Sequence, residues 1–197
     1  MSGDAYIDLA EGKRIVLLRG DITRQDADAI VNAANTHLAP GAGVCGAIHT
    51  AAGSAPFAEA TAHVAEHGAL VPGEAIATGA GNLSGVRHII HAVGPVWHGG
   101  SSGESGALSS AYRRSIEVAD GLGDETIAFP SISTGIFGYP LELAARTALE
   151  AIAEALARTT AVREVRVVLF DEHSLAQWIS AAKDLFGRQF ADAEGGE

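Results

Sequence analysis

The residues with the clearest chemical potential lie in the run VNAANTHLAPGAGVCGAIH, residues 31–49. An apolar segment there ends in asparagines, a glycine-rich loop follows, and we expect a helix to begin near Val44. Glycines let a diphosphate approach the backbone, and the N–H groups of a first helical turn bind anions. Ligands of open α/β sheets bind beyond the carboxyl ends of strands, so this run lies where a site is expected.

The glycines of this loop admit more than one interpretation. Gly41, Gly43 and Gly46 match the dinucleotide-binding spacing G-x-G-x-x-G. In that motif the glycines follow the strand directly, and an acidic residue ends a second strand about 20 residues later. Here residues 35–40 intervene and Glu59 falls in a helical stretch, which disfavours a nicotinamide-dependent oxidoreductase. A loop that only packs closely against its helix is the structural alternative.

A second loop of the same kind, PSISTGIFGYP, spans residues 130–140. It also follows an apolar strand, precedes a helix, combines glycines with hydroxyl groups and contains no cation. Two such loops side by side can hold a diphosphate between N–H donors, and each charge-assisted bond contributes on the order of 1.5 to 3 kcal/mol. Lys and Arg are absent from residues 25–86 and 115–145, so backbone N–H groups must hold any anion bound there.

A third polar element, Gly20-Asp21-Ile22-Thr23, ends the apolar run at residues 14–19. An acidic side chain at this position can accept a hydrogen bond from an adenine amino group. The alternative is a helix N-terminus in which Thr23 and Asp26 form a capping-type pair.

Length and composition restrict the class of protein. The chain has 197 residues, which suits one domain with a single core, and 47% of them are hydrophobic. With 13 Lys and Arg against 24 Asp and Glu, the formal net charge is -11, which disfavours general nucleic-acid binding. Cys45 is the only cysteine, which excludes an internal disulfide and suits a reducing compartment. We expect a cytoplasmic monomer with no leader segment and no membrane span.

Short β-rich runs alternate with helical patterns along the chain, which favours an α/β sandwich with one mixed sheet. The expected strands are residues 14–19, 29–33, 74–78, 87–93, 126–130 and 165–170. Apolar residues recur at helical spacing over residues 108–122, 141–156 and 175–186. The strands at 74–78 and 87–93 are separated by a short glycine-rich turn, so we expect them to form an antiparallel or close neighbour pair in the sheet.

The remaining segments define the limits of the domain. Residues 99–106, GGSSGESG, are expected to form a flexible surface loop, and residues 191–197 an acidic, frayed tail. We therefore expect residues 1–197 to form one domain, with its core at about residues 14–186.

Taken in order, these motifs resemble the macrodomain family, close to its MacroD-like ADP-ribosyl hydrolases. The resemblance covers roughly residues 14–186. It rests on GDITRQDADAIVNAANTHLAPGAGVCGAIHTAAG (20–53), GEAIATGAGNL (73–83), RHIIHAVGPVW (87–97) and PSISTGIFGYP (130–140). It implies a three-layer α/β/α sandwich with a mixed central sheet and a cleft that binds ADP-ribose, and we expect no metal and no further cofactor.

The resemblance also implies roles for individual residues. Asp21 would accept from the adenine amino group, Ile22 would offer its N–H to the same ring, and Phe170 would form an apolar wall for it. From sequence alone, an ordinary core position for Phe170 is an open alternative. Asn35 would bond the distal ribose, against which Phe137 would lie. The residues implied to surround the diphosphate are Gly43, Val44, Ser133, Thr134, Gly135, Ile136, Phe137 and Gly138.

The catalytic set implied by the resemblance is Asn35, Cys45 and His49. His49 matches the family pattern, whereas Cys45 stands where MacroD-like proteins usually have an aspartate that helps to orient or activate water. A thiolate nucleophile and a zinc site built on Cys45 and His49 are less favoured alternatives. Asn32, on the preceding strand, is expected to be a structural partner.

The reaction implied is hydrolysis of ADP-ribosyl esters. Its expected substrates are O-acetyl-ADP-ribose and proteins carrying mono-ADP-ribose on acidic side chains. Water held by Asn35 and by the substrate's own phosphate would attack, and loop N–H groups would balance the developing negative charge. The alternative is a module that reads ADP-ribose on proteins and performs no chemistry.

Overall fold

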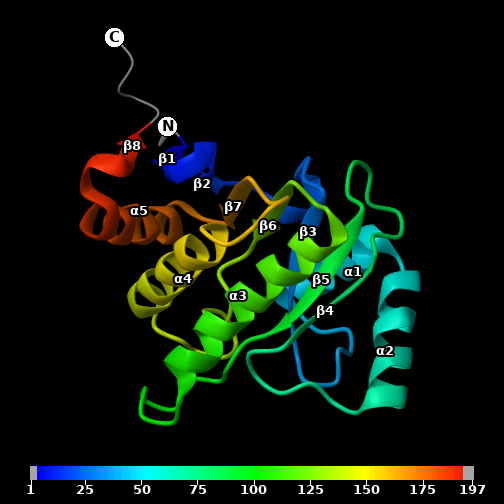
Figure 1. Cartoon of the computed structure of the whole chain (residues 1–197). Helices are drawn as coiled ribbons and strands as arrows, with labels where there is room; N and C mark the ends of the chain where they lie inside the picture. Colours follow the sequence, from blue (N-terminus) through cyan, green and yellow to red (C-terminus); the bar gives the residue numbers. More distant parts are fainter. Residues whose placement is uncertain (1–3, 193–197) are drawn as a thin grey trace.

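The computed structural model describes residues 4–192, which form one mixed sheet covered by helices on both faces (Figure 1). The strands are β1 (Ala5–Asp8), β2 (Arg14–Arg19), β3 (Ala29–Ala34), β4 (Ala75–Gly79), β5 (His88–Val93), β6 (Thr126–Phe129), β7 (Glu164–Leu169) and β8 (Phe190–Asp192). The helices are α1 (Gly43–Ala52), α2 (Ala55–His67), α3 (Glu104–Leu122), α4 (Leu141–Leu156) and α5 (Glu172–Phe186). Three short 3-10 helices are η1 (Ala10–Gly12), η2 (Ile22–Arg24) and η3 (Gly187–Gln189).

The strand order is β4-β5-β3-β6-β7-β2-β1-β8. The central strands β5, β3, β6, β7 and β2 run parallel, and β4, β1 and β8 add antiparallel edges. The antiparallel neighbour pair expected from the sequence is confirmed as β4 and β5, with Ile76 opposite His91. Because the five central strands are parallel, their carboxyl ends meet at one edge of the sheet.

Alternation along the strands builds two apolar layers. In β3, Val31 belongs to the cluster under α3, α4 and α5, whereas Ile30 belongs to the cluster under α1. The same alternation in β7 directs Val167 and Val168 into opposite layers. These two layers confirm the α/β/α sandwich, and Figure 1 shows α3, α4 and α5 lying side by side over one face.

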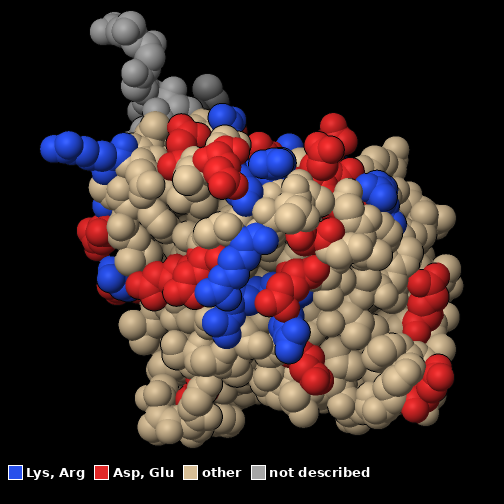
Figure 2. Space-filling model, in the orientation of Figure 1, with Lys and Arg blue, Asp and Glu red and all other residues tan. Residues whose placement is uncertain are grey.

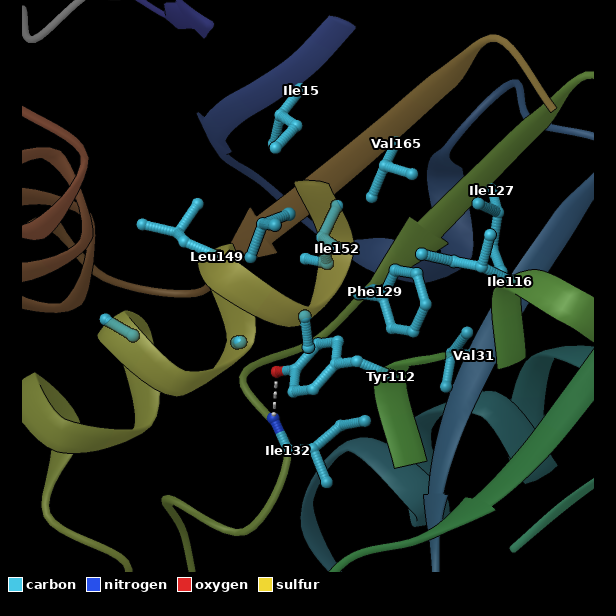
Figure 3. Packing of buried hydrophobic residues seen from close by; sticks show 14 of the residues in the cluster. Ile15, Val31, Tyr112, Ile116, Ile127, Phe129, Ile132, Leu149, Ile152 and Val165 are labelled. Atoms are coloured by element: carbon cyan, nitrogen blue, oxygen red, sulfur yellow. Dashed lines mark hydrogen bonds between the residues drawn. The ribbon is translucent and has the colours of Figure 1, made fainter. Parts of the chain in front are cut away.

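The larger core holds one polar side chain that bears on the site. Tyr112 of α3 is fully buried beside Phe129 of β6, with ring centroids 5.0 Å apart. Its hydroxyl donates to the Pro130 carbonyl over 3.2 Å and accepts from the Ile132 N–H over 3.0 Å (Figure 3). Burial raises the pKa of Tyr112, so the phenol stays neutral and can both donate and accept.

Two expectations about the ends of the domain are wrong. β1 extends the sheet beyond residue 14, and Tyr6 of β1 pairs with Ala191 of β8, so residues 191 and 192 are not a frayed tail. Residues 193–197 lie outside the described part of the chain. The sequence did not predict β1 and β8, because each is only three or four residues long. Pairing with a neighbouring strand stabilises them, rather than an apolar pattern in their own sequence.

The glycine-rich segment at residues 99–106 is also more ordered than expected. Helix α3 begins within it, and Glu104 in the first turn is only 3% exposed. The Glu104 carboxylate accepts from the backbone N–H groups of His98, Gly100 and Ser102 at 2.6 to 3.1 Å. A buried acceptor therefore organises a loop whose glycine content alone predicts flexibility.

The charged side chains are mixed in sign. On the face shown in Figure 2, Lys and Arg side chains lie beside Asp and Glu side chains rather than forming one broad basic area. None of the helices within residues 4–192 has the length and apolar character needed to cross a membrane.

Candidate functional site

A cleft of about 740 Å³ opens at the carboxyl edge of the parallel strands. Its walls come from the residues that follow β2, β3, β6 and β7, together with the N-terminus of α1. Small-molecule sites commonly occupy roughly 300 to 1,000 Å³, so the cleft can hold a nucleotide. The structure thus brings together the three separate polar elements that the sequence indicates, at residues 20–23, 35–45 and 130–137.

Two groups of backbone N–H donors face this cleft without partners inside the protein. Gly43, Val44 and Cys45 form the first turn of α1, and their N–H groups donate to no described residue. The same holds for the N–H groups of residues 133–137 on the opposite wall. None of the described lining residues is Lys, Arg or His. The cleft therefore offers neutral donors to an anion, as the missing cations in the sequence predict.

Ser133 is the most strained lining residue. Its φ is +68°, in the left-handed region that disfavours side chains, and it is 6% exposed. Its Oγ is buried and finds no hydrogen-bond partner in the part of the chain described. Gly94, after β5, allows this conformation, because a Cβ there would overlap the Ser133 Oγ and Ile132. Strain and an unpaired hydroxyl at one residue mark a position that a ligand can satisfy.

The 130–139 loop is held from behind at both ends. Tyr112 fixes its start through the bonds to Pro130 and Ile132. At its end, the Trp97 N–H donates to the Phe137 carbonyl over 2.9 Å, and the Trp97 ring packs 4.5 Å from the ring of Tyr139. The Phe137 carbonyl therefore points into the protein, towards Trp97. The N–H groups of residues 133–137 are not used in holding the loop.

Asn35 lines the cleft and also holds the loop that follows β3. Its Oδ1 accepts from the N–H groups of His37 and Ala39 at 3.1 and 3.2 Å, and its Nδ2 donates to the Ala39 carbonyl over 2.9 Å. An amide nitrogen carries two hydrogens, so one Nδ2 hydrogen remains for a ligand. The ribose contact predicted for Asn35 is compatible with this geometry, but the acceptor oxygen is already occupied.

Asn32, two residues earlier in β3, is 1% exposed and lies inside the sheet. Its Nδ2 lies 3.1 Å from His91 Nδ1, and Thr78 Oγ1 lies 3.0 Å from His91 Nε2. Burial lowers the pKa of His91 to about 4. Asn32 therefore belongs to the interior, as expected.

The opposite end of the cleft is formed by the residues after β2 and β7. Asp21 caps η2, accepting from the Thr23 N–H at 2.9 Å and the Thr23 hydroxyl at 2.7 Å, and these bonds hold its pKa below the ordinary value. The expected capping pair of Thr23 and Asp26 is therefore wrong, because Thr23 donates to Asp21, which is itself the cap of η2. Asp21 and Ile22 also line the cleft. Phe170 is 88% exposed at the rim, which rules out a core position for its ring.

The predicted catalytic residues are only partly brought together. Cys45 lines the cleft but is 5% exposed and packs in the apolar cluster with Ile22 and Ile48. His49 does not line the cleft; its ring packs edge-on against Phe57 of α2, with centroids 4.5 Å apart. It lies one turn further along α1 than Cys45, away from the helix N-terminus. Gly138 also lies outside the lining, where its N–H closes a turn onto the Gly135 carbonyl.

The sequence reasoning assigned no site role to several lining residues, among them Gly94, Asp171 and Ser174. Asp171 caps α5 by accepting from the Ser174 N–H at 2.8 Å and the Ser174 hydroxyl at 3.0 Å. A strand followed by Asp-x-x-Ser and an amphipathic run is a helix-start signal that points to this corner. Gly94, in the pair Gly-Pro after an apolar strand, is likewise typical of a turn at a strand end.

The fold and the cleft define a class of α/β/α protein in which main-chain N–H donors line an open cleft at the carboxyl edge of the sheet. A family model described as Macro domain matches residues 31–148, and the chain belongs to this family. A macro domain-containing protein of Streptomyces coelicolor is 51% identical over 159 residues, covering 80% of this chain and 91% of the relative. The O-acetyl-ADP-ribose deacetylase of Cronobacter turicensis is 45% identical over 161 residues, covering 82% of this chain and 91% of the relative.

Solved structures agree with this membership. The Oceanobacillus iheyensis macrodomain with ADP superposes with a TM-score of 0.87 at 34% identity, covering 93% of this chain and 97% of that one. The Trypanosoma brucei macrodomain in complex with ADP-ribose gives a TM-score of 0.74 at 34% identity, covering 83% of this chain and 67% of that one. The fold inferred from the resemblance is therefore confirmed.

Proposed function

We propose that the chain binds ADP-ribose in the cleft and hydrolyses ADP-ribosyl esters, including O-acetyl-ADP-ribose and mono-ADP-ribose on acidic side chains of proteins. The observation that carries the proposal is that two sets of backbone N–H groups face one cleft without lining cations. The N–H groups of residues 43–45 and of residues 133–137 have no partner among the described residues. Its support from relatives is the similarity to the Cronobacter deacetylase and to the macrodomain solved with ADP-ribose.

The two donor walls suit the diphosphate. An anion between them receives charge-assisted hydrogen bonds from both sides, each contributing about 1.5 to 3 kcal/mol. Asp21, Ile22 and Phe170 then bracket the adenine at one end, and Asn35 and Phe137 bracket the distal ribose at the other. This places the ester at the end of the cleft formed by α1 and the 133–137 loop.

The hydrolytic step follows from what each group can donate or accept. Asn35 has only an amide hydrogen to spare, so it can position water or a ribose hydroxyl but cannot take a proton. The substrate's own phosphate is the acceptor within reach. For an ester on the anomeric carbon, water attacks that carbon, its bond to the ester oxygen breaks, and the carboxylate leaves with the electron pair. For an acetyl ester on a ribose hydroxyl, water attacks the acyl carbon, the bond from that carbon to the ribose oxygen breaks, and the ribose oxygen leaves with the electron pair and takes up the water proton by way of the phosphate. The water proton passes to the phosphate, and loop N–H groups balance the developing negative charge.

Asn35→Ala tests this role. We expect kcat for release of ADP-ribose from O-acetyl-ADP-ribose to fall by about 100-fold, the size found for removing one positioned donor. Because Asn35 also holds residues 37–39, ADP-ribose affinity and thermal stability must be measured on the same protein. Asn35→Asp keeps acceptor oxygens for the His37 and Ala39 N–H groups but loses both amide hydrogens, the spare one and the one donated to the Ala39 carbonyl, so its thermal stability is compared with that of Asn35→Ala. Wild-type turnover in both variants contradicts the assignment.

A reader module without turnover is the second candidate, favoured by Cys45. No described side chain at the N-terminus of α1 carries a carboxylate, and Asp21 and Asp171 are both engaged as caps. Following ADP-ribose release from O-acetyl-ADP-ribose and from a mono-ADP-ribosylated protein decides between the two. Binding of ADP-ribose with no turnover of either substrate identifies a reader, and Cys45→Asp then tests whether a carboxylate restores activity.

A further inference from the structure

The cleft has an uneven distribution of charge. Two of its described lining residues carry charged side chains, Asp21 and Asp171, and both are negative. They follow β2 and β7, which pair in parallel with Arg19 opposite Leu169, and the Gly20 N–H donates to the Leu169 carbonyl over 2.9 Å. Asp21 lies two residues after Arg19, and Asp171 lies two residues after Leu169. The two carboxylates therefore follow the ends of adjacent strands, at one corner of the cleft.

Both carboxylates are fixed and stay ionised. The hydroxyl and N–H of Thr23 lower the pKa of Asp21, and the N–H and hydroxyl of Ser174 lower the pKa of Asp171. The nearest helix N-terminus at this corner, that of α5, is already capped by Asp171. The N-terminus of α5 therefore differs from the first turn of α1, whose N–H donors have no partner among the described residues.

The basic side chains that interact with the two aspartates at this corner, Arg24 with Asp21 and His173 with Asp171, do not line the cleft. Arg24 lies 3.8 Å from the Asp21 carboxylate, but its side chain is 86% exposed and does not line the cleft. Exposed ion pairs of this kind are screened by solvent. A second anion entering the corner would therefore meet two negative side chains and no lining cation.

We infer that this corner makes the site selective for ADP-ribose whose adenosine ribose carries a free 2′-hydroxyl, and that it rejects the 2′-phosphorylated form. The inference rests on the proposed function, because it takes the adenine to lie beside Asp21 and Phe170. The adenosine ribose adjoins the adenine, so a 2′-phosphate there adds close to two negative charges within about one Debye length of both carboxylates. The diphosphate itself lies further along, between the neutral donors.

Binding of ADP-ribose and of 2′-phospho-ADP-ribose, measured by calorimetry at about 0.05 M and about 1 M salt, tests the inference. At low salt we expect the phosphorylated ligand to bind roughly 10- to 100-fold more weakly. At high salt, where charges are screened within about 3 Å, the ratio should shrink towards one. A purely steric exclusion leaves the ratio independent of salt.

Asp171→Asn supplies the decisive variant, because asparagine preserves the helix cap while removing the charge. We expect it to reduce the low-salt ratio of the two dissociation constants by about tenfold. Asp184→Asn is the matched control, since Asp184 lies on the same helix, is 68% exposed and is not a lining residue. It should leave the ratio as in the wild type.

Each outcome bears on a separate claim. Equal affinity for the two ligands, a salt-independent ratio, or an unchanged ratio in Asp171→Asn overturns the inference while the proposed binding of ADP-ribose stands. Failure of ADP-ribose itself to bind overturns the proposed function, and the inference with it.

Discussion

Asp124, just before β6, and Ser133, just after it, are both buried polar residues at opposite edges of the same sheet. Asp124 is fully buried, accepts from His88 Nδ1 at 2.8 Å and forms an ion pair with Arg87 at 3.1 Å. Ser133 is 6% exposed, has a left-handed backbone and leaves its hydroxyl without a partner among residues 4–192. At the amino edge the buried carboxylate has partners within the protein. At the carboxyl edge the buried hydroxyl has none among the described residues.

The difference extends beyond these two residues. At the amino edge Asp28 accepts from the N–H groups of Glu125 and Thr126 at 2.9 and 3.0 Å and so ties β3 to β6. At the carboxyl edge the N–H groups of residues 133–137 remain unpartnered within the described chain. Unmet hydrogen-bonding capacity in an ordered region costs stability, and a ligand can recover that cost. The amino edge therefore serves stability, and the carboxyl edge serves binding.

The largest expected effect comes from breaking the amino edge. Asp124→Ala removes the buried partner of His88 and Arg87 and should lower the free energy of unfolding by about 2 to 3 kcal/mol, since the half-exposed Arg87 is not left as a buried unpaired charge. Urea denaturation measures this change, and ADP-ribose affinity in the folded variant should match the wild type. Asp8→Ala, which removes a 68% exposed carboxylate, should change stability by less than about 0.5 kcal/mol. A loss of affinity in Asp124→Ala contradicts the separation of the two edges.

Midway between the edges, His91 makes stability depend on pH. Burial lowers its folded pKa to about 4, whereas in the unfolded chain it takes up a proton near its ordinary value of 6.5. The stabilisation of the folded state by neutral His91 is therefore fully present above about pH 6.5. It is lost as the pH falls towards 4, by about 3 kcal/mol in total.

His91→Gln should flatten this part of the pH profile, because glutamine keeps polar contact with Asn32 and Thr78 but does not titrate. Urea denaturation between pH 4 and 7 checks it, with the exposed His67 changed to Gln as a control. The lowered pKa values of Asp21 and Asp171 act below this window. An unchanged slope in His91→Gln refutes the assignment to His91.

The support beneath the carboxyl edge can be broken at Gly94. A Cβ there overlaps the Ser133 Oγ, so Gly94→Ala should displace the loop and weaken ADP-ribose binding at least about tenfold, with a stability loss of about 1 to 3 kcal/mol. Gly106→Ala is the control, since nothing lies within 4 Å of a Cβ on that helical glycine. Calorimetric titration of both variants measures the effect, and equal affinities exclude a role for Gly94.

The smallest effect contrasts two serines in one loop. Ser133→Ala removes a hydroxyl without a partner, so stability should stay level or rise by up to about 1 kcal/mol while ADP-ribose affinity falls about fivefold. Ser131→Ala removes the acceptor of the Trp178 indole at 3.3 Å, so stability should fall by about 1 kcal/mol. Thermal unfolding with and without ADP-ribose measures both changes. Identical behaviour of the two variants removes Ser133 from the site.

Much of the fold was predictable from local patterns. The run at residues 165–170 lies within one residue of β7, and the helix expected near Val44 begins at Gly43. The edge strands β1 and β8 were missed because strands this short depend on pairing with distant residues. The loop before α3 was misjudged because the acceptor that orders it, Glu104, becomes buried only when the helix packs.

The sequence by itself determined that two glycine-rich loops without cations follow strands, that the net charge is negative, and that a cysteine stands at position 45. Those properties are local, since they depend only on which residues are neighbours in the chain. Only the tertiary structure decided that His49 packs on Phe57, that Asn35 uses its acceptor on its own loop, and that Asp171 joins Asp21. These are matters of side-chain direction and of contacts between distant segments, which strand pairing and helix packing settle once the chain has folded.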